Sequence, residues 1–428
     1  MSMRTFIEAL DKQGKLVRIK KETNPYLEAA EILKQYDGQT VLFEKVKGSS
    51  YRVAAGVCSS RDLFAQAVGC SKDDLIFRIA DAIAKPSKNR VVEKAVCQEE
   101  VIKDVDLSKI PILTHAKTDL GAYITSGVYS SRGKDGRLNA SMHRASPIAK
   151  NKLVARICHR DLYKNMVDAG GKMPVAIALG LDPVVNLVGA ISAKDVNEYE
   201  IGNTLRPFDM VKCKNSDLLV PADAEIILEG TIDMNETHRE GPFPDITGTS
   251  DVVREKEPVI TIDLITQRKD AIYQGLLPAF NEHRLMMGMP KEPTIFMEVN
   301  KVCKCKNALL TTGGCSWFHA VVQIEKKNPD DGIKAGEAAF KGHASLKHCV
   351  VVEEDINIYD PSDIEWAIAT RVQADKNARI FRGPGSSLDC TAECIEGSDR
   401  RETAKVIVDA TIPSNRPRDK FLKAKLGE

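Results

Sequence analysis

Glycine and proline interrupt the acidic stretch between positions 238 and 248, which reads HREGPFPDITG. Proline removes a backbone donor and clashes with the preceding turn of a helix, and it is excluded from central strands. The stretch therefore predicts a stiff, sharply turned loop that carries Glu240 and Asp245 on either side of an aromatic residue. Such a pair of carboxylates suits general acid and base chemistry. A solvated surface turn is the alternative, because loops are normally polar and exposed.

Length and charge narrow the class of protein. A chain of 428 residues is too long for one ordinary core and predicts two or three domains. Lys+Arg 61 against Asp+Glu 60 leaves a charge of +1, which gives no general reason to expect nucleic acid or a membrane as partner. No apolar run approaches the roughly 20 residues of a membrane helix, and no secretory signal is evident. We expect a cytoplasmic protein, and 11 cysteines without a C-x-x-C pair agree with a reducing compartment.

The pattern of apolar residues changes twice along the chain and predicts an α+β protein. Residues 1–105 mix helical and strand periodicity, as in a small α/β region. Residues 106–304 are rich in short strands separated by polar turns, which indicates a barrel or a curved sheet. Residues 305–428 alternate strands with helices, which is typical of an α/β domain with a partly parallel sheet.

A predicted antiparallel meander in the middle region carries a second polar cluster. Its three expected strands are 123–131, 137–144 and 152–159. A hairpin would bring Arg144 and Arg156 into the same region, and the planar fork of arginine suits phosphate and carboxylate groups. Asn139, His159 and a carboxylate could form a site for a hard cation such as Mn²⁺ or Mg²⁺. Each residue taken alone also fits a structural role, because isolated motifs give many false positives.

The common signature motifs are absent. No G-x-G-x-x-G, G-x-x-x-x-G-K-[ST], H-E-x-x-H or G-x-S-x-G motif occurs, which argues against the usual nucleotide-binding, zinc-protease and hydrolase classes. Lys347 precedes an apolar strand, where a lysine can reach a phosphate as a point charge. A solvated strand end is the alternative for this residue.

Several stretches together resemble the UbiD-type decarboxylases, which use prenylated FMN. The resemblance runs over nearly the whole chain and depends most on the E-G-P-F-P-D core and on an asparagine followed five residues later by an arginine. The stretches that carry it are DVDLSKIPIL (104–113), Asn139-x4-Arg144, RICHR (156–160), LVPA (219–222) with EIILEG after it, EGPFPDITG (240–248), GGCSWFHAVVQI (313–324) and SLKHCVVVEEDINIYDPSDIEWAIATR (345–371).

The resemblance implies a three-part fold. An N-terminal α/β region at 1–105 and a C-terminal α/β domain at 305–428 would flank a central split β-barrel at 106–304, similar to that of flavin reductases. The cofactor would lie between the barrel and the C-terminal domain. The strand-rich middle and the α/β ends read from the residues agree with this arrangement.

The resemblance also implies metal and cofactor ligands. Asn139, His159 and Glu198 match the residues at the divalent metal, usually Mn²⁺, and K⁺ is a further candidate ion. Glu200 stays the alternative to Glu198, because the run 197–202 is one residue shorter than in relatives. The positions that match cofactor-lining residues are Met142, His143, Arg144, Arg156, Ile157, Cys158, His159 and Lys347.

Glu240, Arg144 and Asp245 match the active trio of the family. Arg144 would orient the substrate carboxylate and hydrogen-bond Glu240. Loss of CO₂ leaves a carbanion-like centre, for which the cofactor supplies the electron sink. Burial and a neighbouring carboxylate raise the pKa of a carboxyl group, which would keep one acid protonated. We expect Asp245 to donate the proton, with Glu240 as its partner.

The compact length and the aspartate at 245 resemble the archaeal members that act on trans-anhydromevalonate 5-phosphate and give isopentenyl phosphate. His283 and Arg284 are candidate contacts for the substrate phosphate, with structural roles as the alternative. A 4-hydroxybenzoate or other aromatic acid is the alternative substrate, and a non-catalytic flavin- or metal-binding scaffold is a third hypothesis. The resemblance further implies a flavin prenyltransferase as cofactor supplier and a homo-oligomer, dimeric or higher.

Overall fold

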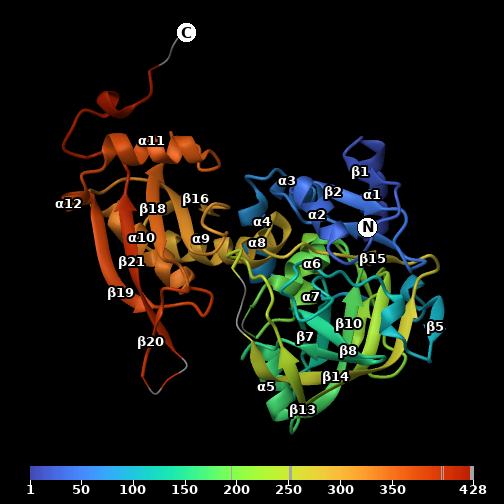
Figure 1. Ribbon diagram of the computed structural model, residues 1–428. Helices are drawn as coiled ribbons and strands as arrows, with labels where there is room; N and C mark the ends of the chain where they lie inside the picture. Colours follow the sequence, from blue (N-terminus) through green and yellow to red (C-terminus); the bar gives the residue numbers. More distant parts are fainter. Residues whose placement is uncertain (194, 250–252, 397, 399, 425–428) are drawn as a thin grey trace. The chain divides into compact units, whose positions relative to one another are not determined.

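The computed structural model describes residues 1–193, 195–249, 253–396, 398 and 400–424 (Figure 1). The chain divides into two compact units, Met1–Met286 and Met287–Glu428. Both units mix helices and sheets, so the α/β character expected from the sequence is confirmed. The central split barrel and the boundaries at 105/106 and 304/305 stay predictions. None of the helices in the described ranges is both long and apolar enough to cross a membrane.

The first sheet of unit 1 has four strands and draws one of them from far along the chain. The order is β1-β2-β3-β15, and β15 pairs in parallel with β3. Its strands are β1 (Leu16–Ile19), β2 (Thr40–Phe43), β3 (Arg52–Ala55) and β15 (Ile272–Gln274). The accompanying helices are α1 (Met3–Lys12), α2 (Glu28–Gln35), α3 (Arg61–Val68) and α4 (Leu75–Ala84). Helix α1 buries Met3, Phe6, Ile7 and Leu10, whose spacing places them on one face.

The second sheet of unit 1 has eight strands, all paired antiparallel, and it positions the candidate site. The order is β7-β6-β10-β13-β14-β9-β8, with β5 paired to β14. Its strands are β5 (Glu100–Ile102), β6 (Val128–Arg132), β7 (Leu138–Met142), β8 (Ala145–Ala149), β9 (Lys152–Ala155), β10 (Lys172–Leu179), β13 (Ile226–Glu240) and β14 (Arg254–Gln267). Ile177, Leu228 and Ile260 are fully buried on one core, so apolar packing fixes the register of the central strands.

The predicted three-strand meander is wrong in its pairing. Strands β6 and β7 form one hairpin and β8 and β9 form another, and these hairpins lie at opposite ends of the strand order. Strand β8 was not among the predicted strands, and its Pro147 is a residue that is rare within sheets. Strand β8 ends the strand order, where a proline is tolerated since one side needs no ladder hydrogen bond.

The predicted loop at 238–248 is shorter than expected. Strand β13 continues to Glu240, which pairs with Arg254, and the turn begins at Gly241. Gly241, Pro242 and Pro244 influence the backbone conformation only from 241 to 244, so they do not predict the conformation of the residues before them. The last part of β13 is largely exposed and polar, and it therefore lacks the alternation of a half-buried strand.

Three further helices and a small sheet belong to unit 1. The helices are α5 (Asp161–Asp168), α6 (Pro183–Ala190) and α7 (Glu198–Leu205), and the sheet has the order β12-β11-β4. Its strands are β4 (Arg90–Val92), β11 (Asp209–Lys212) and β12 (Leu219–Pro221). The Asn197 side chain caps α7 by accepting from the Tyr199 N–H at 3.1 Å. This cap starts the helix at Glu198, a predicted metal ligand. Helix α8 (Asn281–Gly288) follows β15.

Unit 2 is an α/β sheet with the order β16-β17-β18-β21-β19, in which β20 pairs with β21. Strands β17, β18 and β21 are parallel neighbours, as the alternation of strands and helices predicted. The strands are β16 (Lys304–Leu310), β17 (His319–Glu325), β18 (His348–Glu353), β19 (Ala378–Pro384), β20 (Glu393–Cys394) and β21 (Arg401–Asp409). The helices are α9 (Glu292–Asn300), α10 (Asp331–Gly342), α11 (Pro361–Arg371) and α12 (Ala374–Asn377).

Candidate functional site

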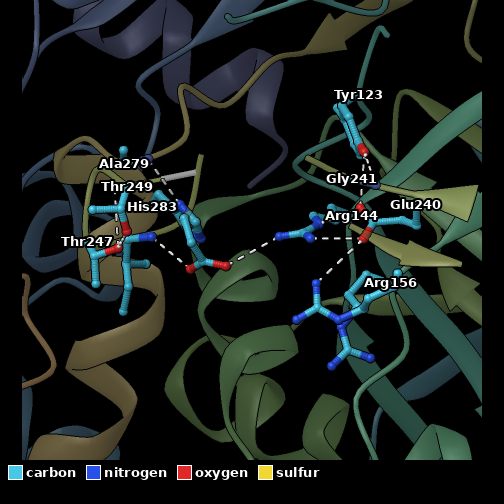
Figure 2. Close-up of polar contacts among 12 residues, drawn as sticks. Tyr123, Arg144, Arg156, Glu240, Gly241, Thr247, Thr249, Ala279 and His283 are labelled. Carbon is cyan, nitrogen blue, oxygen red and sulfur yellow. Dashed lines mark hydrogen bonds and ion pairs between the residues drawn. The ribbon is translucent and has the colours of Figure 1, made fainter. Parts of the chain in front are cut away.

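Arg144, Glu240 and Asp245 form one ion-pair cluster in unit 1 (Figure 2). Arg144 lies in the short link between β7 and β8, Glu240 ends β13, and Asp245 follows in the loop. The Arg144 guanidinium donates from Nε to Glu240 Oε1 at 2.8 Å and from Nη2 to Glu240 Oε2 at 3.0 Å. Its Nη1 donates to Asp245 Oδ2 at 3.3 Å. The structure thus brings together the three residues that the sequence predicts as catalytic.

The two acids have different surroundings. The Glu240 side chain is 0% exposed, and besides Arg144 it accepts a hydrogen bond from the Tyr123 hydroxyl at 3.1 Å. The Asp245 side chain is 15% exposed, makes a single longer contact with Arg144, and accepts the Ile246 N–H at 2.7 Å. Bidentate pairing fixes Glu240 in direction and place. Asp245 keeps some access to solvent, whereas Glu240 has none.

Phe243 lies between the two acids in the sequence, and its ring packs against Arg144 and Tyr123. Its ring is 2% exposed and lies 4.6 Å from the Arg144 guanidinium carbon and 4.6 Å from the Tyr123 ring centre. The Tyr123 hydroxyl also accepts the Gly241 N–H at 3.1 Å, and Gly241 has a φ of 80°, which favours glycine. Burial and the charge of Glu240 raise the pKa of Tyr123, so its hydroxyl remains a donor.

A further ion-pair layer behind Glu240 was not predicted from the sequence. Arg254, on β14, places Nη1 3.9 Å from Glu240 Oε2 and Nε 3.9 Å from Glu257 Oε1. Glu257 in turn accepts from Arg156 Nη1 at 2.9 Å and from the Ile157 N–H at 3.2 Å. The letters REKE at 254–257 are typical of a solvated strand, and only the β13–β14 pairing places Arg254 beside Glu240.

His283 and Arg284 lie on α8 beside the acidic loop. Arg284 Nε donates to the Ile246 carbonyl at 3.1 Å. His283 Nδ1 accepts the Ala279 N–H at 3.2 Å, so the neutral ring carries its proton on Nε2 (Figure 2). Burial lowers the pKa of His283, and the charge of Asp245 opposes that shift. Both predicted phosphate contacts therefore adjoin the loop that carries Asp245.

The two predicted cofactor-lining segments of unit 1 are adjacent. The Arg156 N–H donates to the Arg144 carbonyl at 3.1 Å, which places 156–158 next to 142–144. Within these segments Ile157 is buried and Cys158 is exposed. His143 Nε2 lies 2.9 Å from the Ser141 hydroxyl, and burial lowers the pKa of His143 to about 4. An uncharged imidazole and two arginines form a donor set that fits an anionic cofactor.

Asn139 and Glu198 share a small cavity of about 10 Å³. Glu198 Oε2 accepts the Ala140 N–H at 2.9 Å and the Asn139 amide at 3.3 Å. The cavity is lined by Gly133, Arg137, Asn139, Asp161, Asn165, Ala193, Val196 and Glu198. Amide and carboxylate oxygens are the donors that a hard divalent cation prefers, so this site fits the expected metal. Asp161 and Asn165 were not predicted, because helix α5 brings them in from a separate element.

Two other predicted metal residues lie outside that cavity lining. His159 is exposed, and its ring stacks on Tyr163 with centres 4.1 Å apart. Glu200 accepts the Asn197 amide at 3.5 Å instead, so the geometry favours Glu198 over Glu200. Over the ranges that the structure describes, no three His, Cys, Asp or Glu side chains are arranged to hold a metal ion. The donor set therefore depends on the Asn139 amide.

We expect Mn²⁺ binding to strengthen as the pH rises through about 7. Burial raises the pKa of Glu198 to about 7, with the charge of Asp161 adding to the effect, and a carboxyl group must lose its proton before it binds a cation. Glu198→Gln should weaken Mn²⁺ binding by about tenfold or more and remove this pH dependence. Titration with Mn²⁺ followed by electron paramagnetic resonance measures both. Glu200→Gln is the matched control, and loss of Mn²⁺ from that variant alone would reverse the choice between the two acids.

Lys347 belongs to unit 2, where it precedes β18. Its Nζ donates to Asp389 Oδ1 at 3.0 Å and to the Thr391 hydroxyl at 2.8 Å. Lys347 is thus held by side chains of its own unit rather than ending in solvent.

Comparison with known proteins decides the family. Three models match the chain in succession, and they describe the N-terminal (7–83), Rift-related (89–281) and C-terminal (284–410) domains of 3-octaprenyl-4-hydroxybenzoate carboxy-lyase. A Methanosarcina mazei protein named anhydromevalonate phosphate decarboxylase is 44% identical over 418 residues, 96% of each chain. The chain belongs to the UbiD family. The resemblance read from the sequence motifs is therefore confirmed, and so is the prediction of a decarboxylase.

UbiD-class structures show the same fold. The HmfF enzyme from Pelotomaculum thermopropionicum in complex with FMN has a TM-score of 0.95 and 35% identity, covering 100% of this chain and 98% of that one. An evolved dimeric form of HmfF in complex with prFMN has a TM-score of 0.91 and 34% identity, covering 100% and 97%. A Methanothermobacter thermautotrophicus protein, also named anhydromevalonate phosphate decarboxylase, is 41% identical over 96% of this chain and 97% of its own.

Proposed function

We propose that this UbiD-family protein decarboxylates trans-anhydromevalonate 5-phosphate to isopentenyl phosphate and CO₂ with prenylated FMN and a divalent metal. The observation that best supports this choice of substrate is the 44% identity, over 96% of each chain, to a protein named anhydromevalonate phosphate decarboxylase. Four further relatives at 31–41% identity have the same name. The arginine clamp beside two carboxylates supplies groups that this chemistry needs.

Arg144 and Glu240 position the reacting groups. The Arg144 guanidinium donates to both Glu240 and Asp245, and its planar fork has the geometry that suits a substrate carboxylate. Glu240, held by Arg144 and Tyr123, keeps the guanidinium in one orientation. Prenylated FMN, when bound, supplies the electron sink for the carbon that loses CO₂.

Asp245 is the proton donor in this proposal. Replacement of CO₂ by hydrogen requires one proton at the reacting carbon per turnover. Asp245 is on the loop, partly exposed, and less engaged with Arg144 than Glu240 is. It can therefore release a proton to the substrate and regain one from solvent, whereas Glu240 stays clamped.

The remaining groups hold the ends of the substrate and the cofactor. Arg284 and His283, next to the Asp245 loop, would bind the substrate phosphate. Lys347 would bind the cofactor phosphate, and Asn139 with Glu198 would hold Mn²⁺, with His159 and K⁺ as further candidates. A dianion held in protein needs such cationic partners.

The proposal also covers the supplier of the cofactor, the cellular location and the oligomeric state. A flavin prenyltransferase would supply the cofactor, the protein would act in the cytoplasm, and it would form a homo-oligomer. One neighbour in fold, the evolved HmfF, is described as dimeric.

An assay of CO₂ release tests the substrate. The protein is expressed together with a flavin prenyltransferase and given trans-anhydromevalonate 5-phosphate, its phosphate-free acid, or 4-hydroxybenzoate. We expect turnover of the phosphorylated acid, with a much higher KM for the phosphate-free acid. Turnover of 4-hydroxybenzoate alone would transfer the assignment to an aromatic-acid decarboxylase. Absence of turnover from a flavin-loaded protein would favour a non-catalytic scaffold.

A further inference from the structure

Glu282, in the first turn of α8, is a buried carboxyl group that the proposed chemistry does not use. The residue is 3% exposed. Its Oε2 accepts the Gly56 N–H at 2.8 Å and its Oε1 accepts the Cys58 N–H at 2.8 Å, so both oxygens bind the segment that follows β3. Burial raises the pKa of Glu282 to about 7, and these two N–H groups oppose that rise. The contacts join α8 to the N-terminal part of unit 1.

Helix α8 is anchored closely to this part of the chain. Gly56 has a φ of 73°, and a Cβ there would lie 2.1 Å from the Gln39 carbonyl oxygen, so this position requires glycine. Asp37 is a second anchor, because its Oδ1 accepts the Asn281 N–H at 3.1 Å at the start of α8. A cavity among these groups has a volume of about 20 Å³, which is space for about one water molecule. Helix α8 therefore has little room to shift.

Arg284, in the same part of α8, holds the acidic loop. Its Nε donates to the Ile246 carbonyl at 3.1 Å, and the Ile246 N–H donates to Asp245 Oδ1 at 2.7 Å. Ile246 is 0% exposed, and the Asp245 N–H donates to the Thr249 carbonyl at 3.1 Å, which closes the loop. A series of contacts thus runs from segment 56–58 through α8 to the Asp245 carboxylate.

We propose that Glu282 and Arg284 are positioning residues for Asp245: Glu282 fixes α8, and Arg284 holds the loop from which Asp245 donates its proton. This inference rests on the proposed function, in which Asp245 is the proton donor. Proton transfer needs the donor within hydrogen-bond reach of the carbon, and a displacement of about 1 Å can lower the rate by about 10²-fold. In this role Arg284 acts through Nε, whereas the proposed phosphate contact would use its terminal nitrogens.

The test measures kcat and KM for CO₂ release from trans-anhydromevalonate 5-phosphate by the flavin-loaded, full-length protein. We expect Glu282→Gln to lower kcat by about tenfold or more with KM within about threefold of the wild type, because an amide nitrogen in place of one oxygen cannot accept an N–H. Arg284→Met should lower kcat equally, since it removes the contact with the Ile246 carbonyl. An Arg284→Met protein with a higher KM and an unchanged kcat would overturn the proposal, because Arg284 would then serve the phosphate alone.

The Asp245→Asn background separates a positioning role from a general loss of structure. If Glu282 acts through Asp245, adding Glu282→Gln should change the residual kcat of Asp245→Asn by less than about twofold. The same tenfold loss in both backgrounds would contradict the inference and leave the proposed function intact. Where Glu282→Gln folds poorly, Arg284→Met gives the same comparison, since its side chain is only half-buried. Full turnover by Asp245→Asn would remove the proposed proton donor, and the inference with it.

Glu229 supplies a matched control in unit 1. It is 1% exposed and accepts the Lys214 N–H at 3.0 Å and the Asn215 N–H at 2.7 Å, so it is also a buried carboxyl group with two backbone donors. Glu229→Gln should lose a similar amount of stability in chemical denaturation and keep kcat within about twofold of the wild type. An equal loss of kcat in this variant would show that any weakened anchor lowers turnover, and the specific role of Glu282 would then be wrong.

Discussion

Asp245→Asn is expected to lower kcat by about 10³-fold, because the amide cannot donate a proton to the reacting carbon. The change should leave folding nearly intact. The Asp245 side chain is partly exposed, and its contact with Arg144 is a single one at 3.3 Å. The Ile246 N–H can still donate to the amide oxygen that replaces Oδ1. CO₂ release under saturating substrate gives kcat, and flavin absorbance shows that the cofactor is still bound.

The control for this prediction is the neighbouring acid. Glu240→Gln should lower activity through the orientation of Arg144, and it should also lower stability, since Glu240 is fully buried and holds the guanidinium by two contacts. Asp245→Glu retains an acid on the loop and should recover part of the turnover. An Asp245→Asn protein with full turnover would remove the assignment of Asp245 as proton donor.

The loop at 238–248 shows how far sequence reasoning reaches in this fold. Proline restricts φ and glycine permits a positive φ wherever they stand, so the turn after Gly241 was predicted correctly from local chemistry. The strand that ends at Glu240 was missed, because its outer residues are polar and its partner β14 begins fourteen positions later. Long-range pairing of this kind leaves no local pattern. The hidden strand β8 is a similar case, since its proline is tolerated at the end of the strand order.

The motifs predicted the residues of the ion-pair cluster, and they did not predict the residues that hold this cluster in place. Arg144, Glu240 and Asp245 were selected by their resemblance to a family, and the structure brings them together. Tyr123 and Glu257 belong to no motif, and they enter the site only through the three-dimensional packing of the hairpins. Tyr123 helps to hold Glu240, which is fully buried, whereas Asp245 is partly exposed, and the sequence left this difference undecided.

Arg144→Met is expected to have the second large effect, on both activity and stability. It removes the cation that pairs with Glu240, whose side chain is 0% exposed, and leaves a buried carboxylate beside the Tyr123 hydroxyl at 3.1 Å and Arg254 Nη1 at 3.9 Å. Removing one partner of a buried ion pair typically costs about 3–5 kcal/mol of folding free energy. Loss of the fork that orients the substrate should lower kcat/KM by about 10³-fold or more. Chemical denaturation and CO₂ release measure the two effects separately.

The two effects can be separated by a second change at the same pair. In the double variant Arg144→Met with Glu240→Gln, the unpaired buried charge is removed. Much of the folding free energy lost in Arg144→Met should return, because the loss comes from the buried carboxylate and not from the absence of the Arg144–Glu240 contact. Activity should not return, since the substrate carboxylate still lacks its guanidinium. Arg144→Lys keeps the charge without the planar fork, and it should preserve stability better than activity. Recovery of turnover in the double variant would show that Arg144 serves only to neutralise Glu240, and its proposed role in orienting the substrate would then be wrong.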